Sequence, residues 1–284
     1  MIKIIEDFND VIPQYELFIV DIFGVIHDGL ELYPEVFDNI KKIKQQNKHF
    51  VFLSNAPRRA KIAQQALSDF GIEQNLYDTI MTSGEHAFEY FKNLERQNIT
   101  LKYYYLGPKK DSSLLYDTHH HMVAEPKNAD IVIATGLDPH QQVDDLMPEI
   151  VKIKEANLEL HCINPDKYVH KQSGASHVCA GAVADTYIKM GGKVKYYGKP
   201  HLSIYQAILS KFPHIPKDKI LCIGDGLETD IKGANNIGIT SVLITSGMHV
   251  KELNTTIGTL PTISTVKNLT KKYHSSPSLI APLF

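Results

Sequence analysis

Cysteine is scarce in this sequence of 284 residues. Cys162, Cys179 and Cys222 are the three present, an odd number at wide spacing. That spacing supports neither a disulfide framework nor the closely spaced pairs of a zinc site. We therefore expect three reduced, buried thiols.

Excess charge of either sign and long apolar runs are absent too. The formal net charge is −2, which gives no overall attraction for nucleic acid or anionic lipid, so an anionic ligand needs a local binding arrangement. No apolar stretch approaches the ~18 residues of a membrane helix, and the acidic start MIKIIEDFND is unlike a secretory signal. We expect a cytoplasmic protein that binds neither nucleic acid nor membranes.

What the sequence does contain is a regular alternation of short apolar runs with longer segments of helical period. This alternation is typical of parallel βαβ units, so the predicted fold class is α/β. Three of the apolar runs end on polar residues: Leu17–Val20 before Asp21, Phe50–Leu53 before Ser54 and Asn55, and Ile220–Ile223 before Gly224 and Asp225. Because ligands bind outside the carboxyl ends of parallel strands, these polar groups predict one shared site.

A middle segment, 85–181, has strands and helices of its own. Its predicted strands are Tyr103–Leu106, Ile131–Ala134 and Leu160–Ile163, and Val143–Ala156 is a helix candidate. We interpret it as an α/β domain inserted into a core made of residues 1–84 and 182–284. The triplet His119–His121 stands in a polar stretch, where a solvated loop is the expectation rather than a metal cluster.

Each polar residue at these strand ends has a chemical and a structural interpretation. Asp21 could be a carboxylate nucleophile or a turn cap, and Ser54 and Asn55 could bind phosphoryl oxygens or cap a helix. Lys199, just before a helical segment, could bind phosphate or lie at the surface. Asp225 and Asp230 are oxygen ligands of the kind that Mg²⁺ prefers, although two acids in a loop are common.

The ordered series of these residues resembles the haloacid-dehalogenase-like (HAD) superfamily of hydrolases. Further strings are similar to its branch with a large inserted α/β cap, which includes sugar-phosphate, 4-nitrophenylphosphate and pyridoxal-phosphate phosphatases. These strings are Leu53–Asn55, Thr82–Glu85, Ile163–Asp166, Gly198–Pro200 and Gly224–Asp230. The resemblance spans about residues 17–247 and implies a Rossmann-like core with the cap inserted between the second and third motifs.

The resemblance also implies roles for single residues. Asp21 would attack phosphorus and form an aspartyl-phosphate, while Ser54 and Lys199 would hold the phosphoryl oxygens with support from Asn55. Mg²⁺ would be bound by Asp21, the backbone carbonyl of Phe23 and Asp225. Asp230 would lie outside the metal ligands and orient Lys199 or metal-bound water.

The sequence departs from the family pattern at Phe23. The usual motif has a second acid there, which protonates the leaving oxygen and later activates water. General acid–base help is typically worth about 10²–10⁴-fold, so its loss should slow hydrolysis rather than abolish it. We therefore expect a phosphatase for a small phosphorylated metabolite that favours aryl or acyl phosphates, with His27 or a cap residue as a substitute acid.

Other functions remain open. A binding or regulatory protein that has lost turnover is the main alternative, and Phe23 favours it. A dinucleotide-dependent oxidoreductase would need a Gly-x-Gly-x-x-Gly turn after the first strand, which is absent. Carbon–halogen hydrolysis occurs in the superfamily, but the large cap and the Gly224–Asp230 loop favour phosphate esters.

Substrate choice should come from the cap, because core residues contact only phosphate and metal. Asn164, Asp166, Tyr168 and His170 are the cap residues that we single out as candidate substrate contacts. Members of this branch often dimerise through the cap, so a homodimer is an open alternative to a monomer.

Overall fold

The computed structural model describes residues 2–170 and 176–284. The chain forms two compact units, which we describe separately. Unit 1 comprises residues 1–54, 61–81 and 199–284, and unit 2 comprises residues 55–60 and 82–198. The unit boundaries at 81/82 and 198/199 differ from the 84/85 and 181/182 expected from sequence. The helix α5 (Ala180–Lys189) spans the expected second boundary and belongs wholly to unit 2.

Unit 1 is built on a seven-stranded sheet whose strand order is β1-β14-β13-β12-β2-β3-β4. The strands are β1 (Lys3–Ile4), β2 (Leu17–Asp21), β3 (His49–Ser54), β4 (Thr79–Thr82), β12 (Ile220–Gly224), β13 (Thr240–Ile244) and β14 (Leu279–Ala281). β2 lies between β12 and β3 and pairs with both in parallel. All five of its residues are buried, as expected of a strand covered on both faces.

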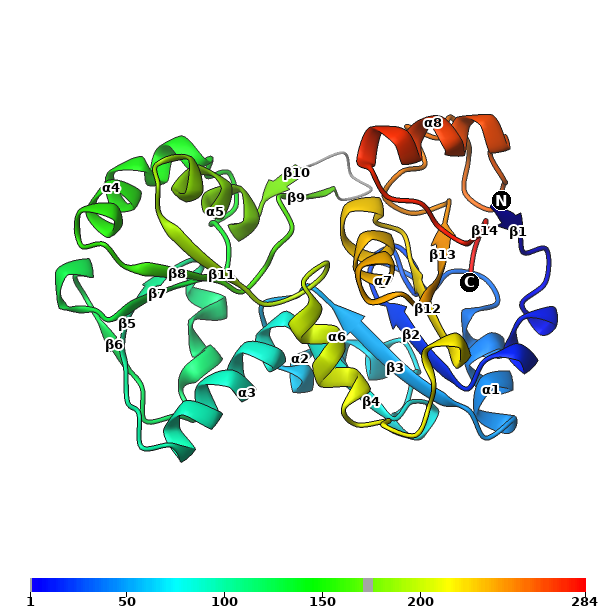
Figure 1. Cartoon of the computed structure of the whole chain (residues 1–284), viewed down its shortest axis with the longest axis horizontal. Coiled ribbons are helices and arrows are strands. Elements are labelled where there is room, and N and C mark those ends of the chain that lie inside the picture. Colours follow the sequence, from blue (N-terminus) through cyan, green and yellow to red (C-terminus); the bar gives the residue numbers. More distant parts are fainter. Residues whose placement is uncertain (1, 171–175) are drawn as a thin grey trace. The chain divides into compact units, whose positions relative to one another are not determined.

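Helices pack on the faces of this sheet (Figure 1). They are α1 (Val36–Gln45), α2 (Ala60–Asp69), α6 (Leu202–Leu209), α7 (Lys232–Ile237) and α8 (Ile263–Tyr273). One core cluster joins Leu17 and Ile19 of β2 to Ile204 and Ile208 of α6. A second joins α8 to β13 and β14. These clusters fix the strands, and with them the loops at their carboxyl ends.

Unit 2 has a five-stranded sheet of its own with strand order β11-β8-β7-β5-β6 and parallel pairing throughout. Its strands are β5 (Lys102–Leu106), β6 (His121–Val123), β7 (Ile131–Ala134), β8 (Glu159–Cys162) and β11 (Lys193–Tyr196). A separate antiparallel pair joins β9 (Tyr168–His170) to β10 (Ser176–Val178).

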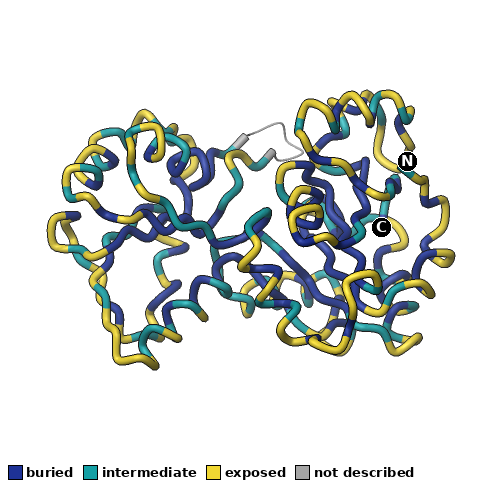
Figure 2. The backbone as a smooth tube through the Cα atoms, viewed as in Figure 1, coloured by how far each residue is buried: buried dark blue, intermediate teal, exposed yellow. Residues whose placement is uncertain are grey.

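Helices cover both faces of the unit 2 sheet. Apolar residues of α4 (Met147–Glu155) and α5 pack on one face, and those of α3 (Ser83–Arg96) pack on the other. Figure 2 shows that buried residues concentrate along the strands, whereas exposed residues gather on helices and loops. Unit 2 is therefore a complete α/β layer structure with its own core.

The structure confirms the α/β class and the strands expected from sequence. Leu17–Val20, Phe50–Leu53 and Ile220–Ile223 lie in β2, β3 and β12. The helix expected at 143–156 begins with a 3₁₀ turn at Val143–Leu146 and becomes α-helical at Met147. Pro148 in the first α-helical turn lacks the N–H that would continue the earlier hydrogen bonds.

The expectation of a solvated loop at His119–His121 was wrong for its last two residues, since His121 already begins β6 and His120 is not solvated. His120 is buried, and its Nδ1 accepts a hydrogen bond from the Leu101 amide while its Nε2 lies 2.9 Å from the Phe91 carbonyl oxygen. These contacts hold the residue that precedes β5 in place. The buried thiols were expected correctly, since all three cysteines are free and buried. Among the residues described, no helix is long and apolar enough to cross a bilayer.

The central position of β2 predicts where unit 1 is sensitive to truncation. Leu17 is 0% exposed and Leu30 is 80% exposed. We expect Leu17→Ala to lower the free energy of unfolding by about 2–5 kcal/mol, because it removes buried methyl groups and leaves a cavity. The matched change Leu30→Ala should alter it by less than about 0.5 kcal/mol. Urea denaturation of both variants measures this, and equal losses would contradict the assigned core.

Candidate active site

Asp21 is the last residue of β2, at the carboxyl end of the central strand of unit 1. It pairs in register with Leu53 of β3, so Ser54 stands one residue beyond that pair. β12 pairs with the opposite side of β2, and Asp225 follows its last residue. Three neighbouring parallel strands thus end in Asp21, Ser54 and Asp225 at one edge of the sheet, as the sequence predicted.

Asp225 is held by closely approaching backbone. A Cβ added at Gly24 would lie 2.0 Å from Asp225 Oδ2, and one at Gly247 would lie 2.3 Å from it. Gly24 also has φ +83°, which favours glycine. The Met248 amide donates a hydrogen bond of 2.7 Å to the same oxygen. The loop after Phe23 therefore lies directly against the Asp225 carboxylate.

Asp230 belongs to the π-helical turn Leu227–Ile231 that follows Asp225. Its Oδ2 accepts hydrogen bonds from the Gly226 amide at 3.2 Å and the Thr229 hydroxyl at 3.1 Å. Its Oδ1 accepts one of 2.8 Å from Lys199. The side chain is buried, and each of its oxygens has a donor, so Asp230 supports its neighbours through fixed hydrogen bonds.

Lys199 joins the carboxylates. Its ammonium lies 2.6 Å from Asp21 Oδ1 and 2.8 Å from Asp230 Oδ1, and it donates to the Leu53 carbonyl oxygen at 3.4 Å. The residue is 2% exposed. It was expected either to bind phosphate or to lie at the surface, and the structure excludes the surface position.

Electrostatics in this cluster are dominated by burial. Burial raises the pKa of Asp21 well above its usual range, and Asp230 and Asp225 add to this against the opposing effect of Lys199. Burial lowers the pKa of Lys199, but the carboxylates of Asp21 and Asp230 outweigh it, so this pKa is raised. Lys199 therefore stays positively charged, while ionisation of Asp21 is energetically unfavourable in this environment.

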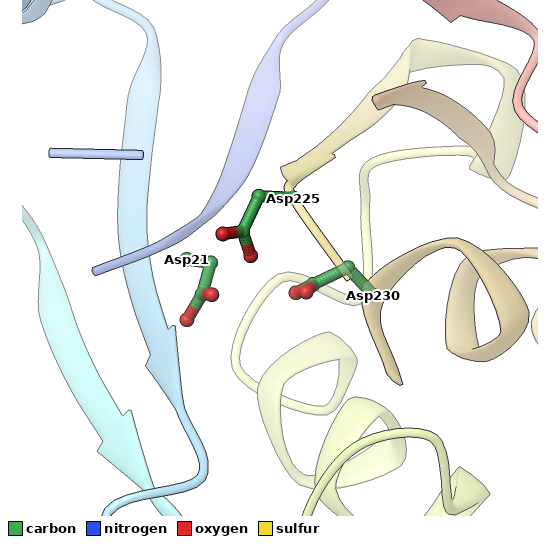
Figure 3. Close-up of side chains that lie close together, drawn as sticks. All are labelled: Asp21, Asp225 and Asp230. Atoms are coloured by element: carbon green, nitrogen blue, oxygen red, sulfur yellow. The ribbon is translucent and has the colours of Figure 1, made fainter. Parts of the chain in front are cut away.

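The three acids form a suitable ligand set for a divalent cation. Asp21, Asp225 and Asp230 each offer an oxygen, and these oxygens all lie within 4.8 Å of one another. Figure 3 shows the three carboxylate groups directed into a common space. Carboxylate oxygens are the ligands that Mg²⁺ prefers, and a divalent charge would offset the repulsion that raises the pKa of Asp21. The residues fit the metal that the sequence implies.

Asn55 has contacts within unit 2. Its Nδ2 donates a hydrogen bond of 2.8 Å to Asp166 Oδ1, and its Oδ1 accepts one of 3.4 Å from the Ser83 hydroxyl. A Cβ at Gly198 would lie 2.6 Å from Asn55 Oδ1. Asn55 therefore links three segments of unit 2, where the sequence suggested phosphate contact.

Phe23 and His27 lie in the loop after Asp21. Phe23 is 38% exposed, and its ring meets the His27 ring edge-on at 6.0 Å. His27 stacks on Phe70 at 4.8 Å, and its Nδ1 accepts a hydrogen bond from the Gly29 amide. Burial lowers the pKa of His27, although Asp28 opposes this. A neutral, stacked imidazole is a poor substitute for the missing acid.

The four cap candidates lie near one another in the sequence but have different environments. Asn164 is buried, and its Oδ1 accepts a hydrogen bond from the Asp166 amide. Asp166 accepts from Asn55, as described above. Tyr168 of β9 is 50% exposed. His170 is the last residue of β9, and its side chain lies outside the described part of the chain.

Sequence reasoning missed the groups that hold the acids in place. Gly247 and Met248 follow β13, a neighbour of β12, so the carboxyl end of that strand was a usable signal. Thr229 was visible beside Asp230 but received no role. The Leu53 carbonyl contact depends on backbone geometry, for which a sequence offers no signal.

The electrostatic cost at Asp21 gives a stability prediction for metal-free protein. The pKa of Asp21 is higher in the folded protein than in the unfolded chain. Ionised Asp21 therefore destabilises the fold increasingly as the pH rises above the pKa that this residue has in the unfolded chain. We expect Asp21→Asn to raise the free energy of unfolding in EDTA at pH 7.5 and to have a smaller effect near pH 4. Urea denaturation at both pH values measures this. Asp218→Asn, at an exposed site, should change stability by less than about 0.5 kcal/mol, and destabilisation by Asp21→Asn at pH 7.5 would contradict the assignment.

Comparisons with known proteins agree with this geometry. The profile of the haloacid dehalogenase-like hydrolase family matches residues 18–119, and an HAD-hydrolase-like profile matches residues 196–271, together more than half of the chain. The chain is similar to 4-nitrophenylphosphatase of Schizosaccharomyces pombe, with 21% identity over 87% of this chain and 89% of that protein. It is also similar to sugar-phosphatase AraL of Bacillus subtilis, with 23% identity over 81% of this chain and 82% of that protein.

A solved structure extends the likeness to the fold of the whole chain. The structure of a haloacid dehalogenase-like family hydrolase from Brucella suis superposes with a TM-score of 0.82 and 24% identity, covering 99% of this chain and all of that one. Both profiles, the parallel sheet and the order of Asp21, Ser54, Lys199 and Asp225 along the chain point to the same family. The chain belongs to the haloacid dehalogenase-like hydrolase superfamily.

Proposed function

We propose that this chain is a Mg²⁺-dependent phosphatase that hydrolyses a small phosphate monoester through an aspartyl-phosphate on Asp21. The observation that supports it most is the convergence of Asp21, Asp225, Asp230 and Lys199. Lys199 forms ion pairs with Asp21 and Asp230, and the three acids offer oxygens that all lie within 4.8 Å of one another. The similarity to 4-nitrophenyl- and sugar-phosphatases supports the same reaction class.

The first half-reaction transfers the phosphoryl group to the enzyme. A carboxylate oxygen of Asp21 attacks phosphorus, the new bond is Asp21 O–P, and the bond that breaks joins phosphorus to the leaving oxygen. Lys199 attracts the negative charge of the phosphoryl oxygens, and Ser54, at the end of the neighbouring strand β3, donates a hydrogen bond to one of them. Water then attacks the acyl phosphate, which regenerates Asp21 and releases inorganic phosphate.

The metal would be held by Asp21, Asp225 and the backbone carbonyl of Phe23, with Asp230 in support. When bound, Mg²⁺ supplies neutralisation of phosphoryl charge. Support for the carbonyl comes from Gly24, whose backbone lies against Asp225 and so brings the preceding peptide close to that carboxylate. The hydrogen bonds of Asp230 to Gly226 and Lys199 favour a supporting role for that residue.

The cap function falls to unit 2 in this proposal. Its residues 82–198 would cover the leaving group and so choose the substrate. Of the three cap candidates whose side chains the structure describes, Tyr168 is the exposed one, and we assign the substrate contact to it. Asn164 and Asp166 are tied to backbone and to Asn55, so we assign them to the support of that loop instead.

A binding protein without turnover is the second candidate, because Phe23 stands where the superfamily usually has an acid. It would keep the phosphate and metal contacts but release no product. A turnover assay separates the two functions.

Phosphate release tests the proposal directly. We expect the purified chain to hydrolyse 4-nitrophenyl phosphate in the presence of Mg²⁺ and to lose this activity in EDTA. Asp21→Asn should lower kcat on the order of 10³-fold or more, since it removes the nucleophile. Mg²⁺-dependent hydrolysis that survives in Asp21→Asn would refute the proposed intermediate, and binding of phosphate without any hydrolysis would favour the second candidate.

The missing acid predicts the substrate class. Leaving groups that need no proton should suffer least, so we expect kcat/KM for aryl or acyl phosphates to exceed that for alkyl sugar phosphates. Phe23→Asp should reduce the ratio of these two kcat/KM values by about 10²-fold, within the usual range of general acid catalysis. Phe23→Asn is the matched control, because asparagine has nearly the size of aspartate but no proton that it can transfer to the leaving group. Equal turnover of aryl and alkyl phosphates by the unmodified protein would contradict this prediction.

A further inference from the structure

The loop that follows β13 contains a second buried polar cluster, about which the proposed reaction says nothing. His249 is 3% exposed, and it lies one residue after Met248, whose amide holds Asp225. Its Nδ1 lies 2.7 Å from Glu252 Oε2, and its Nε2 accepts a hydrogen bond of 3.1 Å from the Leu227 amide. Both ring nitrogens therefore have a partner within unit 1.

The Leu227 amide opens the turn that carries Asp230. The first N–H groups of a helical turn have no acceptor inside the turn and need one from elsewhere. His249 supplies that acceptor in a buried environment, where an unpaired amide is costly. The same loop thus fixes both acids, Asp225 through the Met248 amide and Asp230 through the start of its turn.

Glu252 decides which nitrogen of His249 carries the proton. For Nε2 to accept from Leu227, the proton must be on Nδ1, where Glu252 accepts it. Although burial opposes it, hydrogen bonds from Lys272, His249 and Tyr273 lower the pKa of Glu252 to about 2, so it is a carboxylate. Lys272 and Tyr273 at the end of α8 (Figure 1) contact this carboxylate and fix its position.

We propose that His249 and Glu252 form a positioning pair for the metal site, in which Glu252 holds the tautomer of His249 that caps the Asp230 turn. Partners that hydrogen-bond a metal ligand directly typically change metal affinity 10–100-fold when they are lost. The pair acts one contact further out, through the Leu227 amide, so we expect an effect at or below the lower end of that range. This inference rests on the proposed function, because it assigns the acid cluster to a divalent cation. His249 itself contacts neither substrate nor metal.

Direct metal binding tests the pair without relying on turnover. Mn²⁺ is the probe, and its dissociation constant is measured by electron paramagnetic resonance on the full chain, beside Mg²⁺-dependent phosphate release. His249→Phe keeps an aromatic ring against Tyr273, which lies 5.0 Å from the imidazole, but removes the acceptor. We expect Mn²⁺ affinity to fall several-fold, up to about tenfold, and the Mg²⁺ concentration for half-maximal activity to rise in parallel, with a smaller change in KM for substrate at saturating Mg²⁺.

Two further variants separate positioning from folding. His249→Gln offers a carbonyl oxygen to the Leu227 amide and should restore most of the affinity, while Glu252→Gln should weaken it as His249→Phe does. His214→Phe and His214→Gln, at an exposed histidine of unit 1, are matched controls and should leave Mn²⁺ binding unchanged. Thermal melts identify any variant that does not fold, in which case Glu252→Gln carries the test.

The outcomes are distinct. The positioning pair alone is overturned if Mn²⁺ affinity is unchanged in folded His249→Phe and Glu252→Gln. It is also overturned if His249→Phe and His249→Gln lose equal affinity. Absence of Mn²⁺ binding and of phosphate release in the unmodified chain overturns the proposed function and this inference together.

Discussion

The structure of unit 1 depends on burying three carboxylates around one ammonium. Each of Asp21, Asp225, Asp230 and Lys199 is less than a tenth exposed, so water contributes little to stabilising their charges. In such surroundings the attraction within an ion pair rarely offsets the full desolvation free energy of its charges. Burial of β2 and β12 along their whole length stabilises the fold enough to hold the acids close together despite their repulsion.

This arrangement explains several features that otherwise look unrelated. Glycines at 24 and 247 permit backbone to approach the Asp225 carboxylate at distances that a side chain would block. Backbone amides and the Thr229 hydroxyl satisfy the oxygens of the acids. Each of these contacts favours the charged form of a carboxylate over the neutral one. The site is therefore rigid around its acids and is prepared for a ligand that carries positive charge.

Much of this could be predicted from sequence because the strands are strongly patterned. Continuous apolar runs that end on an acid, such as the one before Asp21, identify both a buried strand and the edge where chemistry is placed. The role of Asn55 was harder to predict, because a side-chain amide at a strand end can hydrogen-bond either to a ligand or to a neighbouring loop. Its contact with Asp166 depends on a residue 111 positions away in the chain. The burial of His120 was beyond reach for the same reason, since local pattern does not encode long-range hydrogen bonds. The position of Met248 after β13 was a usable signal that sequence reasoning did not take up.

The contact between Lys199 and the Leu53 carbonyl joins positions 146 residues apart in the chain. All of unit 2 lies in that interval, and closing so long a loop without prior order would cost considerable entropy. When unit 2 is folded, fewer disordered residues separate Leu53 from Lys199, so bringing these two residues together costs less entropy. During synthesis, the ribosome would thus release Asp21 long before its cationic partner, and the acid cluster could be assembled only after the inserted unit had been synthesised.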